Sequence, residues 1–167
     1  MSIVRKADFY FGSMLSGLIN NGLAPAIIEP GESRRIYSIA TDKGDYLVYA
    51  KYVSAPLKRQ NKETQLWQFV FSPDEIDYIQ NFEENNKSIY FALICGQERL
   101  QDSEIAILTL GEAKDCLDLK FKRDSYRITI KSEKGIHGLK AYGTGRADIL
   151  DGKDNTIRVP RDMLACF

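Results

Sequence analysis

The sequence lacks the residue patterns by which many enzymes and metal-binding proteins are identified. It contains one histidine, His137, and three cysteines, Cys95, Cys116 and Cys166, with no CxxC pair. The odd number and wide spacing of the cysteines argue against a disulfide framework and give no support to a structural zinc site. Phosphate-binding glycine loops and EF-hand calcium loops are also absent. The sequence therefore names no metal and no cofactor.

Long apolar runs and an excess of charge of one sign are also missing. No run approaches the 18 apolar residues of a membrane span, and no apolar segment follows the first charged residues as in a signal peptide. We therefore expect a cytoplasmic protein without a membrane partner. Lys plus Arg and Asp plus Glu each number 23, so the net charge is zero. This balance argues against nucleic-acid binding by bulk charge, although it leaves room for a local basic patch.

The composition is that of a globular protein. Hydrophobic residues make up 44% of the 167 residues and charged residues 28%, which is typical of one folded domain. Nine tyrosines and eight phenylalanines favour a fold that contains strands. We interpret residues 1–167 as a single globular domain.

Apolar periodicity and turn residues predict the elements. Helices are expected at residues 7–21, 73–82 and 109–119, the last two each beginning with a capping box, Ser72 to Glu75 and Thr109 to Glu112. Strands are expected at residues 35–40, 46–53, 66–71, 88–95, 104–110, 126–131, 136–142 and 156–159. Residues 23–32, 55–65 and 143–155 are expected to be connections without regular structure. The predicted class is α/β or α+β, with a mixed β-sheet, about three flanking helices and residues 34–71 at its centre.

Lys51 is the one polar residue inside the apolar run of residues 46–53. In a strand it shares one face with Tyr49 and Val53, and the opposite face is also apolar or aromatic. A lysine in this position either reaches water at the end of the strand or lies in a pocket with an acidic or anionic partner. The first alternative is structural, whereas the second allows contact with a phosphate or another anion.

The order helix, three strands, helix, strand, with a lysine late in the second strand, resembles the restriction-endonuclease-like PD-(D/E)xK fold over residues 7–95. The resemblance implies a divalent metal held by an acid two residues before the lysine and by a second acid on the preceding strand or turn. The first position is occupied here by Tyr49, while Asp42 and Asp45 lie in the preceding turn and Glu29 and Glu32 lie further upstream. The resemblance therefore implies a site that no longer cleaves, with Lys51, Asp45 and Asp42 as the catalytic candidates.

Charge is unevenly distributed along the chain. Residues 34–62 contain seven basic residues against two acidic ones, whereas residues 73–84 contain five acidic residues and no basic one. One interpretation is a basic patch for a phosphate backbone, with aromatic side chains as stacking surfaces. The others are a polarised or self-complementary protein contact and an ordinary solvated surface with local ion pairs. The binding candidates are Lys51, Lys58, Arg59, Lys62 and Trp67.

Three functions are compatible with these observations. The first is a nucleic-acid-associated domain with a nuclease-like but catalytically incomplete site. The second is a non-enzymatic protein-interaction or inhibitor module that could self-associate into an oligomer. The third, a metal-dependent nuclease, requires a divalent metal and at least two carboxylates near Lys51. The single histidine, His137, offers no catalytic arrangement with Cys95 or Cys116.

Overall fold

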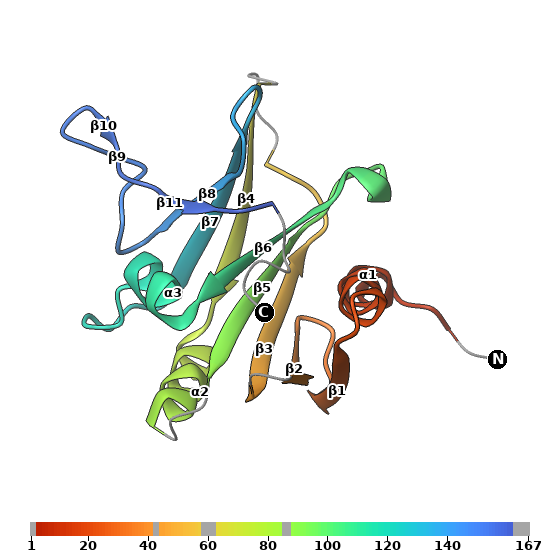
Figure 1. The fold of residues 1–167 in the computed structure, drawn as a ribbon. Coiled ribbons are helices and arrows are strands. Elements are labelled where there is room, and N and C mark those ends of the chain that lie inside the picture. Colours follow the sequence, from red (N-terminus) through yellow and green to blue (C-terminus); the bar gives the residue numbers. More distant parts are fainter. Residues whose placement is uncertain (1–2, 42–43, 58–62, 85–87, 162–167) are drawn as a thin grey trace.

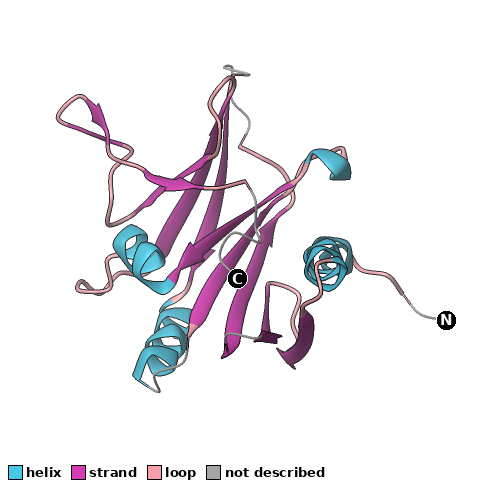
Figure 2. Cartoon of the chain, viewed as in Figure 1, coloured by secondary structure: helices cyan, strands magenta, loops and turns pink. Residues whose placement is uncertain are grey.

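Two β-sheets share one apolar core, and three α-helices cover their remaining surfaces (Figures 1 and 2). The computed structural model describes residues 3–41, 44–57, 63–84 and 88–161. Within these residues, no helix is both long enough and apolar enough to cross a membrane. The predicted α/β or α+β class with a mixed sheet is confirmed.

The first sheet has five strands in the order β1–β2–β3–β5–β6. Their bounds are β1 Ala24–Glu29, β2 Arg34–Thr41, β3 Gly44–Val53, β5 Ile89–Cys95 and β6 Glu104–Thr109. β3 and β5 run parallel and all other neighbours are antiparallel. Helix α1, Lys6–Asn20, lies on one side of this sheet, whereas α2, Pro73–Glu84, and α3, Leu110–Leu117, lie on the other (Figure 1).

The second sheet is antiparallel and has the order β11–β8–β7–β4. Its strands are β4 Thr64–Phe71, β7 Tyr126–Glu133, β8 Leu139–Gly143 and β11 Ile157–Val159. A two-stranded ribbon, β9 Ile149–Leu150 and β10 Lys153–Asp154, projects beside it (Figure 1), and a short 3₁₀ helix, η1 Leu100–Asp102, precedes β6. The chain thus leaves the first sheet after β3, forms β4 in the second sheet and returns through α2 to β5.

The alternation of apolar residues explains how the layers are joined. Trp67, Phe69 and Phe71 of β4 point into the core between the sheets, where they meet Tyr49 and Phe91 of the first sheet. The opposite face of the first sheet packs on α1 through a second cluster. In α1 the buried positions Ala7, Tyr10, Phe11, Met14 and Leu18 recur at helical spacing. Both faces of β3 and β5 are therefore covered.

Several helices begin or end at the residues that the local sequence predicted. Ser72 and Glu75 form the predicted capping box, in which the Glu75 amide donates to Ser72 Oγ over 3.2 Å. The second predicted box, Thr109 with Glu112, begins α3. Gly22 has a φ of +84°, as expected of a residue that terminates a helix in the left-handed region.

Two connections differ from the sequence prediction. Residues 23–32 were expected to be irregular, but Ala24–Glu29 forms the edge strand β1 with Pro25 inside it. An edge strand tolerates proline because its outer side needs no hydrogen-bond donor. The strand at 66–71 exists as predicted, but it pairs with β7 and belongs to a second sheet, where one mixed sheet was expected. The predicted loop 143–155 contains the β9–β10 ribbon.

Candidate functional site

Lys51 lies on β3 with its ammonium group turned into the protein, and the residue is only 7% exposed. The prediction that it reaches water at the end of the strand is therefore wrong. Its Nζ donates to the carbonyl of Val70 over 2.5 Å and to the two carboxylate oxygens of Glu75 over 3.0 and 2.9 Å. These three contacts match the three donors of an ammonium group. The partner of Lys51 is thus an acidic residue of the same chain.

Glu75 reaches Lys51 because α2 begins directly after β4. The turn at Ser72 places Glu75 in the first turn of α2, where its carboxylate also lies 3.4 Å from the Ser72 amide nitrogen. Val70, whose carbonyl accepts from Lys51, lies on β4. Lys51 therefore connects three elements: β3 in the first sheet, β4 in the second sheet, and α2.

Tyr49 extends this polar group along β3. Its hydroxyl donates to Glu75 Oε2 over 2.5 Å and accepts from Arg34 over 3.1 Å. Burial, together with the neighbouring Glu75 carboxylate, raises the pKa of Tyr49 well above its usual range. The phenol therefore remains protonated and acts as a hydrogen-bond donor at the position where the resemblance implies a metal-binding acid.

Arg34 and Glu29 complete the arrangement. Arg34 is the cross-strand neighbour of Lys51 on β2, and its Nε and NH2 groups lie 3.2 and 3.1 Å from Glu29 Oε1 on β1. The guanidinium also lies over the ring of Tyr78 on α2, 5.0 Å from its centre. We refer to Glu29, Arg34, Tyr49, Lys51 and Glu75 as the Lys51 cluster.

The charges of the Lys51 cluster balance, because two carboxylates face two cationic side chains. Burial lowers the pKa of Lys51, and the Glu75 carboxylate opposes this effect by favouring the charged form. Both carboxylates already contact a cation of the same chain, at 2.9 Å for Lys51 and 3.1 Å for Arg34. Among the described residues, no group of three or more His, Cys, Asp or Glu side chains could hold a metal ion. A divalent metal does not fit this set of donors.

The structure does not bring Asp45, the other described catalytic candidate, to Lys51. Asp45 pairs with Ala40 near the β2–β3 turn, six positions before Lys51 on the same strand, which corresponds to about 20 Å. Asp42 lies outside the described residues, as do Lys58, Arg59 and Lys62 of the basic loop. Glu32, on the segment between β1 and β2, instead pairs with Arg5.

Trp67, the predicted stacking residue, belongs to the core. It is 1% exposed, and its indole Nε1 donates to the carbonyl of Gly96 over 2.8 Å. A base could not stack on this ring without opening the core. Trp67 therefore has a structural position, and an aromatic contact for a ligand has to come from another residue.

The histidine and the described cysteines do not form a second site. His137 is exposed in the turn between β7 and β8. Cys95 and Cys116 are buried, and burial raises the pKa of both thiols, to about 12 for Cys116. Thiols that stay protonated are poor nucleophiles. Cys166 lies outside the described residues.

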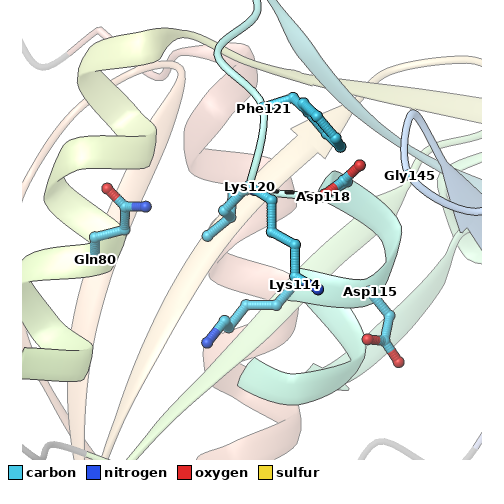
Figure 3. A pocket seen from close by; sticks show the side chains of 8 residues that line it. Gln80, Lys114, Asp115, Asp118, Lys120, Phe121 and Gly145 are labelled. Atoms are coloured by element: carbon cyan, nitrogen blue, oxygen red, sulfur yellow. Dashed lines mark hydrogen bonds between the residues drawn. The ribbon is translucent and has the colours of Figure 1, made fainter.

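A groove between α2 and α3 is a feature that the sequence prediction missed. It has a volume of about 590 Å³ and is lined by Gln80, Lys114, Asp115, Asp118, Leu119, Lys120, Phe121 and Gly145. Figure 3 shows Gln80 of α2 and Lys114 of α3 on the two sides of the groove, with Phe121 at one end. We call it the α2–α3 groove. The signal in the sequence was the run Lys120-Phe121-Lys122 directly after the third predicted helix.

Phe121 is 64% exposed, and both neighbouring lysines, Lys120 and Lys122, are exposed. The loop that carries them is held by Arg123, which donates to the carbonyl of Asp118 over 2.9 Å and pairs with its carboxylate. Asp118 has a φ of +54°, a left-handed conformation that ends α3 and redirects the chain. The loop thus presents an aromatic ring between two cations.

Comparison with protein-family models, with curated proteins and with solved structures finds no match to this chain. Function therefore has to be argued from the Lys51 cluster, the α2–α3 groove and the exposed surfaces of the molecule.

Proposed function

We propose that the protein is a nucleic-acid-associated domain that binds single-stranded nucleic acid without cleaving it. The observation that supports binding is the exposed ring of Phe121, which lines the α2–α3 groove together with Lys120 and is followed in the chain by the exposed Lys122. Nonspecific single-strand sites combine aromatic rings, on which bases stack, with cations that follow the phosphates. A three-residue run supplies both kinds of contact.

The surroundings of the ring favour a strand lying along the α2–α3 groove. Lys114 and Gln80 face the groove from its two sides, while Asp115 lies on the side of α3 away from Gln80 (Figure 3). The carboxylate of Asp118 is paired with Arg123. A phosphate in the groove would meet lysine and amide side chains, and of the two carboxylates that line the groove, that of Asp118 is already paired.

The element order supports the nuclease-like part of the proposal. The expected order was a helix, three strands, a helix and a strand, with the lysine late in the second strand. In the structure four strands, β1 to β4, lie between α1 and α2, β1 is the strand that was not expected, and Lys51 lies late on β3, the strand predicted at residues 46–53. The absence of cleavage is supported by the closed Lys51 cluster. Its lysine is paired with Glu75 and its arginine with Glu29, and Tyr49 occupies the position of the metal-binding acid.

Fluorescence anisotropy of a labelled oligothymidine of about 20 nucleotides, a length that exceeds typical single-strand sites, tests the proposal. Phe121→Ala should weaken binding about 5- to 150-fold, because base stacking is worth about 1–3 kcal/mol. Lys120→Gln with Lys122→Gln should reduce the slope of log K against log salt by about 1.4. Lys153→Gln, which removes an exposed cation on the β9–β10 ribbon, is the matched control.

The same oligonucleotide should remain intact when incubated with magnesium or manganese ions. Cleavage that is lost in Lys51→Met would contradict the closed site. Binding that does not weaken with salt, or that is equal in wild type and Phe121→Ala, would contradict the nucleic-acid site at the α2–α3 groove. Lack of any binding at low salt would end the proposal as a whole.

A protein-interaction module is the second candidate, favoured by exposed apolar side chains on α1 and η1. Phe9 is 55% exposed and Leu100 is 51% exposed. They lie near α1, on the side of the first sheet opposite α2 and α3 (Figure 1). A partner bound at this surface would leave the α2–α3 groove free.

A further inference from the structure

We infer that α1 and η1 form the contact surface of a homodimer, and that a second copy of this chain covers it. Phe9 on α1 and Leu100 on η1 both line two neighbouring depressions, of about 580 and 420 Å³. The two side chains therefore form an apolar ridge between two hollows. A ridge that is half exposed to water on a helix whose opposite face packs on the core is typical of a contact surface.

The smaller hollow makes the outer side of α1 complementary to itself. Phe9, Gly12, Ser13 and Ser16 follow one another at helical spacing and all line this hollow. No heavy atom lies within 4 Å of the position that a Cβ atom would take at Gly12. If two copies of α1 meet antiparallel across a two-fold axis, the Phe9 ring of each enters the hollow at Gly12 of the other.

The charged residues beside the larger depression are also complementary to those of a second copy related by a two-fold axis. Lys6 and Glu98 are exposed, line the larger depression and form no ion pair with another described residue. The neighbouring charges are already engaged, Asp8 with Arg35 and Arg99 with Asp102. In an isologous contact, Lys6 of each copy can lie opposite Glu98 of the other, so that one cation and one anion per chain give two equivalent pairs. Charge complementarity therefore favours a second copy as the partner.

This inference does not depend on nucleic-acid binding. The surface of α1 and the α2–α3 groove lie on opposite sides of the first sheet (Figure 1). A dimer formed through α1 would carry its two grooves on the outside, and each groove would remain open to a ligand. Loss of dimerisation and loss of oligonucleotide binding can therefore be observed separately.

Sedimentation velocity over a roughly hundredfold range of protein concentration tests the dimer, because association follows mass action. We expect wild type to approach twice the mass of the chain at the upper concentrations. Gly12→Leu fills the hollow without entering occupied space and should raise the dimer dissociation constant at least about tenfold. Gly111→Leu is the matched control, since Gly111 is a helical glycine that also has room for a Cβ atom, the nearest atom to that position lying at 4.0 Å. The control should dimerise as wild type does.

A charge exchange tests the orientation of the two copies. Lys6→Glu and Glu98→Lys should each weaken the dimer, because like charges then face one another across the two-fold axis. The double variant restores opposite charges and should recover most of the wild-type affinity. A monomeric wild type at every concentration would overturn the inference. A dimer that is unaffected by Gly12→Leu, or one that the double charge variant does not recover, would show that the copies meet elsewhere and would equally overturn it.

Discussion

Lys51 and Glu75, 24 positions apart in the chain, form an ion pair in which the ammonium lies 2.9 Å from one carboxylate oxygen and 3.0 Å from the other. The lysine side chain is 9% exposed and the glutamate side chain 15%. The pair lies where the chain passes from the first sheet into the second, and Lys51 also holds the backbone of β4 at Val70. This relationship gives Lys51 a structural explanation.

Lys51→Met should lower the free energy of unfolding by about 3–5 kcal/mol, because it leaves the Glu75 carboxylate buried without its cation. The methionine also cannot donate to the carbonyl of Val70. Urea unfolding at neutral pH measures the effect. Lys153→Met, at an exposed lysine of the β9–β10 ribbon, should change stability by no more than about 0.5 kcal/mol.

The double variant Lys51→Met with Glu75→Gln separates the ion pair from the packing around it. Removing both charges abolishes the unpaired carboxylate and should recover a large part of the loss, since a buried ion pair is often replaceable by neutral groups. If the double variant is as unstable as the sum of its two parents, then the two charges do not act as a pair.

Gly96→Ala should destabilise the protein by about 1–3 kcal/mol, as overpacking of a close contact does. A Cβ atom at this position would lie 2.7 Å from the carbonyl oxygens of Val53 and Ser54 and 2.8 Å from the Tyr10 ring. The Gly96 carbonyl also accepts the Trp67 indole hydrogen bond, so a shift of this backbone disturbs the core. Thermal unfolding of Gly96→Ala beside Gly111→Ala measures the difference; equal stability of the two variants would contradict the tight contact.

The parts of the fold that the sequence predicted are those that depend on neighbouring residues. The capping boxes at Ser72 and Thr109 and the left-handed Gly22 are local, and all three are found. Strand pairing depends on distant residues, and here one mixed sheet was expected where the structure has two. β4 follows the β2–β3 hairpin in the chain, but its partner β7 begins only at Tyr126. β1 was missed because Pro25 was interpreted as a turn signal, although proline is also tolerated in an edge strand.

The candidate site was predictable in its parts and not as a whole. The sequence singled out Lys51 as a cation that either reaches water or has an anionic partner, and Glu75 as a capping residue, but nothing in the sequence places one beside the other. That contact depends on the change of sheet at β4, which brings the first turn of α2 back to β3. Asp45 was favoured because it is close to Lys51 in sequence, although an extended strand separates residues by about 3.3 Å per position.

Trp67 is the only tryptophan of the chain, and its fluorescence should report on the core and not on ligand binding. Because the ring is 1% exposed, we expect little quenching by acrylamide and no response to an added oligonucleotide. The variant Phe121→Trp in a Trp67→Phe background transfers the probe to the α2–α3 groove, where the residue is 64% exposed. Its emission should be quenched by acrylamide and by stacked bases. An oligonucleotide that quenches Trp67 in the wild type would contradict the assignment of Trp67 to the core.

The two buried thiols should make the protein lose stability in alkaline solution. Burial raises the pKa of Cys95 and Cys116 from an ordinary value of 9.0, to about 12 for Cys116. Between these values the thiol is protonated in the folded chain and ionised in the unfolded chain. The unfolded state therefore binds fewer protons, and stability falls as pH rises. The stabilisation is complete below pH 9 and is lost at about 1.4 kcal/mol per pH unit for each thiol above it.

Lys51 acts in the opposite direction as pH rises toward its ordinary pKa of 10.5, because burial lowers the pKa of its ammonium and loss of the proton then favours the folded state. The effect of the thiol is therefore isolated by comparing how steeply the free energy of unfolding falls with pH in the two proteins, and not by comparing its absolute values. Cys95→Ala should be less stable than wild type at neutral pH, because it leaves a cavity, yet its stability should fall less steeply between about pH 9 and pH 10. Urea midpoints under reducing conditions provide the comparison. Parallel curves for wild type and Cys95→Ala would show that this thiol titrates alike in the folded and unfolded chains.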